Sequence, residues 1–378
     1  MLFILSFLMA GKLDGAVWTF ESDFPQPFFL EARERLIDVS DRGETFFIDT
    51  LNPRMTRVDG SGKVVSVIAN QGQGPGEMIQ PTHLEIHGDR VFVKDTGKNC
   101  ISIWKTDGSF VQQIKTKGRN FGMSLCTVRD GFVLADWDFS NNPQKPIQAL
   151  FYSTTTDSRT VLWETERLTA TGGSVARMGK SPRVQFNPAK DNYFLASTKS
   201  GDTLFISEPG DKLKIHVVDV GSGKKINTIT EPLNRIPFNT DWGNNQLRLW
   251  KEYTDSLSDA PQGVKVETDF TENFPLVRGF FVAADDNLVV SLWTGLPDTR
   301  QAYLVFNARG EKTESALTDP ALNRVLALIG DNAYVTTYNK EKEVSGFAVV
   351  PRDGVDPFIE SNPIEYDGHL PYDIYLVR

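Results

Sequence analysis

The sequence predicts an all-β chain, a six-bladed β-propeller of four-stranded antiparallel blades with one helical insertion between blades four and five. Three observations predict this fold. Short apolar runs rich in β-forming residues alternate with tight-turn signals along the whole chain. Two turn signals recur in each unit, and most units are about 45 residues long, which is typical of a propeller blade.

The first set of turns is expected between the first and second strands of each blade. Each is a polar or glycine-containing pair that precedes a β-forming run. The second members of these pairs are separated by roughly 45, 43, 61, 95 and 45 residues, so two intervals carry insertions. The six pairs are Arg42-Gly43, Gly88-Asp89, Asp130-Gly131, Asp191-Asn192, Asp286-Asn287 and Asp331-Asn332.

A second set of turns follows the first and is expected between the third and fourth strands. Asp-Gly and Gly-Ser pairs tolerate the positive φ that tight hairpins need. We expect the strand that closes the ring to come from one end of the chain, either residues 17–21 or residues 373–378. The six pairs of this set are Asp59-Gly60, Asp107-Gly108, Asp157-Ser158, Gly221-Ser222, Arg309-Gly310 and Asp353-Gly354.

The second expected blade carries a family resemblance. Its segments GQGPGE, Pro81, GDRVFVKD and NCISIW resemble the NHL-type repeat and its bacterial six-bladed propeller relatives. The resemblance covers about 45 residues, and the other blades keep the turns but lack the GPGE signature. It implies the propeller fold and leaves function open, because relatives of this shape are binding scaffolds, lyases, and lactone or ester hydrolases.

The domain organisation follows from the repeat. Residues 17–378 are expected to form one propeller domain, with a helix-containing insertion at about 230–274. Residues 1–16 contain an apolar run that is too short to span a bilayer and resembles a signal-peptide core, although a basic segment before it is missing. This predicts a secreted or periplasmic protein. The alternative is a cytoplasmic protein whose N-terminal run is a strand that helps to close the ring.

Strand order separates the connections into two groups, which lie at opposite ends of the blades. We call the end with the first-to-second and third-to-fourth turns the turn end, and the opposite end the loop end. The loop end receives the second-to-third and inter-blade connections, which are long here, so we expect function there and at the mouth of the central channel. The long connections are 135–146, 164–182, 230–274 and 291–301, with 197–214 as a possible extra hairpin.

The insertion contains one expected helix, over residues 244–258. Leu247, Trp250 and Leu257 recur at helical spacing, Asp241 is a possible cap, and Pro261 ends the pattern. The apolar stripe either packs on the propeller or forms a lid or partner-docking helix over the channel mouth.

Several aromatic and basic side chains fall in or beside the connections of the loop end. Aromatic residues flanked by arginine are typical of surfaces that contact proteins or sugars. The alternative is that each tryptophan packs between neighbouring blades. The candidate ligand-binding residues are Arg54, Lys94, Trp137, Trp293, Arg300 and Tyr338.

The sequence contains no recognisable catalytic or metal-binding motif. No two of the four histidines have the short spacing of a zinc pair. His83 is the one weak candidate for a metal ligand, and the alternative is that it is a hydrogen-bonded structural histidine. GQGPGE lacks the Lys-Ser/Thr of a phosphate loop, and no nucleophile elbow is present. Cys100 and Cys126 are expected in the third strand of blade two and the inner strand of blade three, too far apart for a disulfide.

The net charge of −9 and pI near 5.1 disfavour a nucleic-acid partner, and no segment predicts a transmembrane anchor. The leading hypothesis is a monomeric, non-catalytic extracytoplasmic scaffold that binds a protein or glycan through the loop end and needs no cofactor. The alternative is a metal-assisted lyase or lactone/ester hydrolase that uses Ca²⁺ or Zn²⁺ in the central channel. A purely architectural subunit of an envelope assembly is the third hypothesis.

Overall fold

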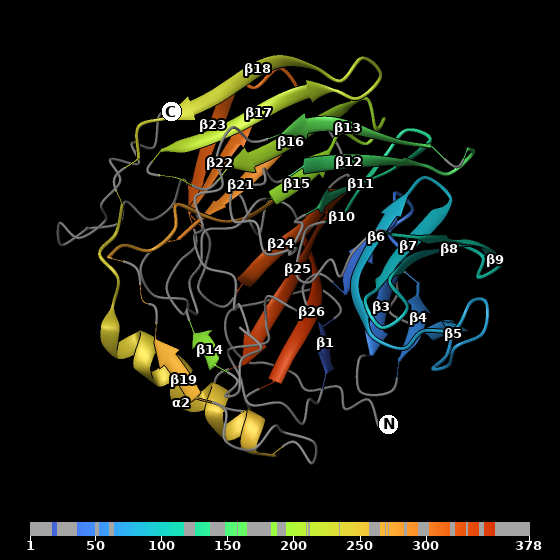
Figure 1. Ribbon diagram of the computed structural model, residues 1–378, viewed down its shortest axis with the longest axis horizontal. Coiled ribbons are helices and arrows are strands. Elements are labelled where there is room, and N and C mark those ends of the chain that lie inside the picture. Colours follow the sequence, from blue (N-terminus) through green and yellow to red (C-terminus); the bar gives the residue numbers. More distant parts are fainter. Residues whose placement is uncertain are drawn as a thin grey trace.

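A computed structural model of the chain describes residues 17–20, 36–49, 53–59, 64–116, 125–136, 148–156, 158–164, 183–186, 194–208, 210, 212–233, 235–256, 265–268, 270, 272–282, 286–293, 302–317, 322–329, 332–339 and 344–351. Most of these residues form four-stranded antiparallel β-sheets that follow one another around a ring (Figure 1), and α2 is the one helix among the described residues.

Five sheets each contain four strands that are consecutive in the sequence. The first blade contains β2 (Ile37–Val39), β3 (Thr45–Asp49), β4 (Arg54–Val58) and β5 (Val64–Ala69). The second contains β6 (Pro81–His87), β7 (Arg90–Asp95), β8 (Cys100–Lys105) and β9 (Phe110–Lys115). The third contains β10 (Leu125–Val128), β11 (Gly131–Asp136), β12 (Gln148–Ser153) and β13 (Arg159–Glu164). The fourth contains β15 (Phe194–Ser197), β16 (Thr203–Glu208), β17 (Leu213–Asp219) and β18 (Lys224–Glu231). The fifth contains β20 (Val277–Val282), β21 (Leu288–Leu292), β22 (Ala302–Phe306) and β23 (Lys312–Leu317).

A composite sheet joins the two ends of the described chain. It contains β24 (Leu322–Ile329), β25 (Asn332–Asn339), β26 (Val344–Pro351) and, as its fourth strand, β1 (Val17–Phe20). β1 pairs antiparallel with β26, with Val17 opposite Ala348. Its innermost strand, β24, contacts β2 of the first blade and β20 of the fifth. Of the two segments expected to close the ring, residues 17–21 contain the strand that pairs with β26, and residues 373–378 lie outside the described residues.

The predicted fold class needs a correction. The described residues form five blades of four consecutive strands, not the six blades predicted, and the remaining four-stranded sheet is assembled from both ends of the chain. The turn pattern predicts a sixth blade from the pairs Asp331-Asn332 and Asp353-Gly354, and the second pair lies outside the described residues. A further sheet, β14 (Arg183–Phe186) with β19 (Lys265–Thr268), is two-stranded and parallel and is not a blade.

The first turn of the fourth blade also differs from the prediction. The run after the expected pair Asp191-Asn192, which lies outside the described residues, is the first strand of the blade and not the second. The first-to-second turn is Thr198–Asp202, so residues 197–214 hold this turn and β16 and do not form an extra hairpin. Strand propensity identified the run as β but could not say which strand of the blade it forms.

The larger hydrophobic clusters each lie between two neighbouring blades. Between the second and third blades, for example, Phe92 lies edge-to-face with Phe132, which stacks on Tyr152 at 5.1 Å between ring centroids. Because both faces of a blade are covered, inner and middle strands such as β7 are buried along most of their length, whereas every residue of the outer strand β9 is exposed or half-buried. Each fully buried large apolar side chain contributes about 1.5–3 kcal/mol.

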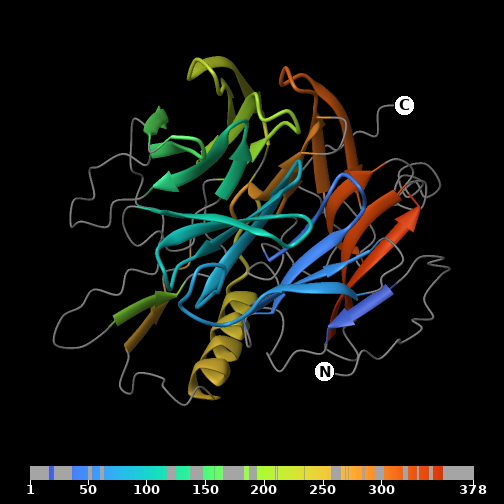
Figure 2. The same ribbon diagram turned by 90° about the vertical axis from the view of Figure 1, so that its right-hand side faces the viewer.

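The insertion between the fourth and fifth blades contains α2 (Thr240–Ser256), which begins four residues before the expected helix. Its cap is Asn239, whose Oδ1 accepts the Trp242 N–H at 2.9 Å, whereas the expected cap, Asp241, lies in the first helical turn. α2 and the β14–β19 pair lie close to each other beside the blades (Figures 1 and 2).

Candidate functional site

The predicted ligand-binding residues do not form one exposed surface among the residues that the structure describes. Lys94, in β7, and Trp293, directly after β21, are buried, with 3% and 6% of their surface exposed. Arg54 begins β4 and is half-buried, and only the strand position of Tyr338, in β25, is described. Trp137 and Arg300 lie outside the described residues. The role of all six in binding stays a prediction.

Trp293 belongs to an aromatic cluster that holds the insertion on the propeller. Its ring stacks on Phe274 at 5.4 Å between centroids, and the Trp242 ring of α2 lies edge-on to it at 5.9 Å. Phe238 packs on Phe274 at 4.8 Å, and Gly243 allows the helix to approach, because a Cβ there would lie 2.7 Å from the Phe238 ring. This tryptophan packs the insertion onto the loop end of the fifth blade.

The GPGE segment is explained by local structure at the loop end. Glu77 accepts the Gly74 N–H at 2.7 Å, and the Lys98 ammonium donates to the carbonyl oxygens of Gly74 and Glu77 at 2.8 and 3.1 Å. The carboxylate of Asp95, which has no exposed surface, accepts backbone N–H groups of Ile79, Gln80 and Lys98. The segment is thus an inter-blade connection fixed by one buried carboxylate and one lysine.

His83 lies in β6, is 8% exposed, and stands opposite Lys94 in the β6–β7 register. Within the described ranges, no three His, Cys, Asp or Glu side chains are grouped closely enough to hold a metal ion. Cys100 begins β8 and Cys126 lies in β10, as predicted, and both are buried free thiols. The metal role of His83 stays a prediction.

One group of charged side chains comes together near the turn end, on and beside the innermost strands. Asp38 Oδ2, on β2 of the first blade, accepts the Ile86 N–H of the second blade at 2.7 Å. Glu85 Oε2, on β6 of the second blade, accepts the Thr127 N–H of the third blade at 2.7 Å. Each carboxylate therefore joins its own blade to the backbone of the next blade around the ring.

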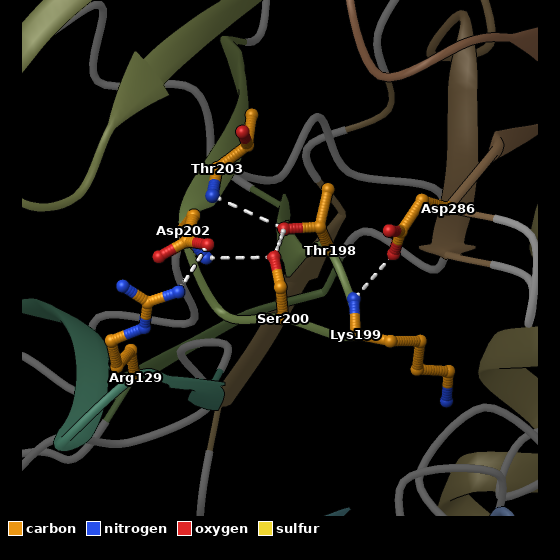
Figure 3. Close-up of polar contacts among 7 residues, drawn as sticks. All are labelled: Arg129, Thr198, Lys199, Ser200, Asp202, Thr203 and Asp286. Carbon is orange, nitrogen blue, oxygen red and sulfur yellow. Dashed lines mark hydrogen bonds and ion pairs between the residues drawn. The ribbon is translucent and has the colours of Figure 1, made fainter.

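The same kind of contact continues into the fourth and fifth blades. The Ser197 hydroxyl of the fourth blade donates to the Thr127 carbonyl of the third. Asp286 Oδ1, in the first turn of the fifth blade, accepts the Lys199 N–H of the fourth at 2.6 Å (Figure 3). Side-chain oxygens thus link five successive blades through backbone groups.

The first turn of the fourth blade shows how tightly this end is built (Figure 3). Thr198 Oγ1 accepts the Thr203 N–H at 3.1 Å, and Gly201 has a φ of +72° that favours glycine. A Cβ on Gly201 would also lie 2.1 Å from the backbone nitrogen of Arg129, in the third blade. The Arg129 guanidinium pairs with Asp202 at 2.5 Å, while the Lys199 side chain is directed away from this pair.

Lys199 and four neighbours form what we call the turn-end charged cluster. The Lys199 ammonium lies 3.9 Å from Asp41 Oδ1 of the first blade. Burial, and then the Asp38 charge, raise the pKa of Glu85 to about 8, although the Thr127 N–H and Lys199 act in the opposite direction. Burial, followed by Lys199, lowers the pKa of His87, and Asp41 opposes this. Glu85 is therefore mostly protonated at neutral pH. The cluster consists of Asp38, Asp41, Glu85, His87 and Lys199.

Sequence reasoning missed this cluster. Its residues come from three blades and share no local motif. The one available signal was positional, because each residue lies at the end of a first strand or in the turn that follows it. The fourth blade could not have contributed even this signal, since its first turn was misplaced in the prediction.

No family model matches the chain, and no curated protein matches it, so the resemblance to NHL-type repeats stays a prediction. Solved structures that resemble the chain are β-propellers. A member of the DUF4221 family from Bacteroides vulgatus has a TM-score of 0.50 at 10% identity, with 90% of this chain and 100% of that one covered. A gluconolactonase from Xanthomonas campestris has a TM-score of 0.44 at 13% identity, covering 92% and 94%. An exported protein from Bacteroides fragilis has a TM-score of 0.45 at 12% identity, covering 88% and 95%.

The sheet topology and the similarity to the DUF4221 family member show the fold class: the chain is a β-propeller of four-stranded antiparallel sheets. Within the described ranges, no helix has the length and apolar character needed to cross a membrane.

Proposed function

We propose that this protein is a non-catalytic extracytoplasmic propeller that binds a protein or glycan through its loop end. The observation that supports this proposal is the use of the inner carboxylates. Asp38, Glu85 and Asp286 each accept a backbone N–H of a neighbouring blade. These are the groups that chemistry at the ring centre would require, and here they hold blades together.

The energetic argument separates the two ends of the ring. A carboxylate that moved toward a substrate would leave a part-buried backbone N–H without its acceptor, at a cost of about 1–3 kcal/mol for each group. The turn end is therefore suited to be a rigid base. The long connections and the insertion belong to the opposite end, where variation in length does not disturb the inter-blade bonds.

The test compares two sets of substitutions in the full chain. The loop-end set is Arg54→Ala, Trp137→Ala and Arg300→Ala, which leaves the buried Lys94 and Trp293 unchanged. The control set is Asp89→Ala, in the first turn of the second blade, with Arg90→Ala at the start of β7. Both sets are tested on a glycan panel and by cross-linking to envelope proteins.

We expect the loop-end set to weaken binding at least tenfold and the control set to leave it unchanged. A loss of binding confined to the control set would place recognition at the turn end and contradict the proposal. Binding that both sets leave intact would do the same.

A second candidate, a metal-assisted lyase or lactone/ester hydrolase, is favoured by one observation. The Glu85 carboxyl, with a pKa raised to about 8, keeps a proton at neutral pH and is the kind of group that acts as a general acid. This candidate predicts turnover of lactones or esters, a higher melting temperature with Ca²⁺ or Zn²⁺, and a loss of about 100-fold or more in kcat for Glu85→Gln. Unchanged turnover in Glu85→Gln would rule out that role.

A further inference from the structure

A buried histidine lies at the boundary between the third and fourth blades, outside the sites described above. His216, in β17 of the fourth blade, is 2% exposed. Its ring lies against the Trp163 indole of β13, in the third blade, with 4.3 Å between ring centroids and 30° between planes. The contact therefore joins the outer halves of two blades.

Glu208, at the end of β16, connects both rings. Its Oε2 lies 3.2 Å from His216 Nε2, and its Oε1 accepts the Trp163 Nε1–H at 3.3 Å. The hydrogen of His216 Nε2 has no well-directed acceptor, so the attraction to Glu208 is mainly one between charges. On the other side of the ring, His216 Nδ1 lies 3.4 Å from the Thr228 hydroxyl.

Other charges face this contact from each surrounding strand. Lys214 of β17 lies 2.8 Å from Glu208 Oε2, and the Lys225 ammonium of β18 lies 5.9 Å from the centroid of the Trp163 ring. On β13, the exposed Glu164 accepts a hydrogen bond from Gln148. The imidazole is the group in this set whose type gains and loses a proton between about pH 5 and 8.

We propose that His216, Glu208 and Trp163 form a proton-operated latch between the third and fourth blades. When protonated, the imidazolium is attracted both to the Glu208 carboxylate and to the π face of Trp163. When neutral, it loses both attractions while remaining buried. The latch closes as pH falls and loosens as pH rises.

Glu208 supports a contact that tightens as pH falls, because the carboxylate keeps its negative charge between about pH 5 and 8. Burial alone would raise the pKa of Glu208, but the contacts with His216 and Lys214 outweigh it and lower the pKa to about 2. The carboxylate therefore stays ionised over that pH range. The contact lies toward the loop end, since Glu208 ends its strand at the second-to-third connection of the fourth blade.

The experiment follows the fluorescence of Trp163 in the full chain, taken as the difference between wild type and Trp163→Phe. An imidazolium in contact with an indole quenches its emission, so we expect this difference to be smaller at pH 5.5 than at pH 8.5. His216→Gln should abolish the pH dependence. Glu208→Gln should move its midpoint to lower pH by about one unit. His87→Gln, at the turn end, is the matched control and should retain the wild-type profile.

A Trp163 emission that is independent of pH would overturn the proposal, and so would an identical pH profile in His216→Gln. If His216→Gln does not fold, the test rests on wild type and Glu208→Gln, with the titration of the His216 ring proton followed by NMR. An unchanged midpoint in Glu208→Gln by both measurements would then contradict the latch.

Discussion

The two ends of the ring are held together by different physical means. At the turn end, carboxyl oxygens of Asp38, Glu85 and Asp286 accept backbone N–H groups across blade boundaries. At the loop end of the fifth blade, the insertion is held by packed aromatic rings, with Phe274 and Trp293 at the centre. Directed polar bonds fix the register of neighbouring blades, whereas aromatic packing holds an added segment without fixing every backbone group.

This difference has consequences that can be measured. Hydrogen bonds to carboxylates respond to pH and to the loss of a single oxygen. Aromatic packing is insensitive to pH, buries more apolar area and tolerates no cavity. Substitutions at the loop-end anchor should therefore have the largest effects on stability, and those at exposed charges of the turn end the smallest.

Phe274→Ala is expected to have the largest effect. Its side chain is 1% exposed and contacts three aromatic rings, so truncation removes buried area and leaves a cavity. We expect a loss of about 4 kcal/mol in the free energy of unfolding, measured by urea denaturation. Ile226→Ala, at a position that is 58% exposed, is the control and should change stability by less than about 0.5 kcal/mol. Equal effects of the two substitutions would show that the cluster does not anchor the insertion.

Asp95→Ala should follow, because it tests a loop-end connection that is held by polar bonds. The substitution leaves the N–H groups of Ile79, Gln80 and Lys98 without their acceptor. We expect a loss of about 3 kcal/mol in the free energy of unfolding and faster hydrogen exchange of these three amides. Asp95→Asn retains one acceptor oxygen and should recover part of the loss. Exchange rates equal to those of wild type would mean that the GPGE connection is held by something else.

Much of the fold could be predicted from sequence because turn chemistry is local. Gly43 and Gly88 have positive φ and lie in the predicted first turns. The sequence left open whether residues 17–21 or residues 373–378 close the ring, because nothing near β26 shows that its neighbour is β1. The misplaced first turn of the fourth blade has a related cause. The strand β15 is a short apolar run, and so is a typical second strand of a blade, so the sequence does not show which of the two strands it forms.

The charged cluster could not be predicted for a different reason. The pKa of Glu85 depends on burial and on Asp38, a residue of another blade, and neither is visible in its sequence neighbourhood. Lys94 and Trp293 were predicted to lie on a binding surface, but both are buried. Their residue types suggested a binding surface, but burial depends on packing between distant segments.

Glu85→Gln tests the pH response of the turn end. Because the pKa of Glu85 is raised from 4.5 to about 8 in the folded protein, the native state holds this proton more tightly than the unfolded state does. The wild type should therefore lose stability as pH rises from 4.5 through about 8, and the variant should not. We expect Glu85→Gln to be more stable than wild type by about 2 kcal/mol at pH 9, measured by urea denaturation at several pH values. Parallel pH profiles would contradict the assigned pKa.

Arg129→Ala should have the smallest effect on the free energy of unfolding, although the Arg129–Asp202 ion pair joins the third and fourth blades at the turn end (Figure 3). Both side chains are exposed, at 61% and 42%, so solvent screens the pair, and we expect a loss below about 0.5 kcal/mol that disappears in 1 M NaCl. The matched comparison is Asp286→Ala, which removes the acceptor of the Lys199 N–H and should cost about 1 kcal/mol at either salt concentration. Asp286→Asn keeps an acceptor and tolerates the positive φ of this position, so it should behave like wild type. If Arg129→Ala lowered the free energy of unfolding more than Asp286→Ala, exposed ion pairs would hold the turn end together. The turn end would then not differ from the aromatic anchor of the insertion by its hydrogen bonds to backbone N–H groups.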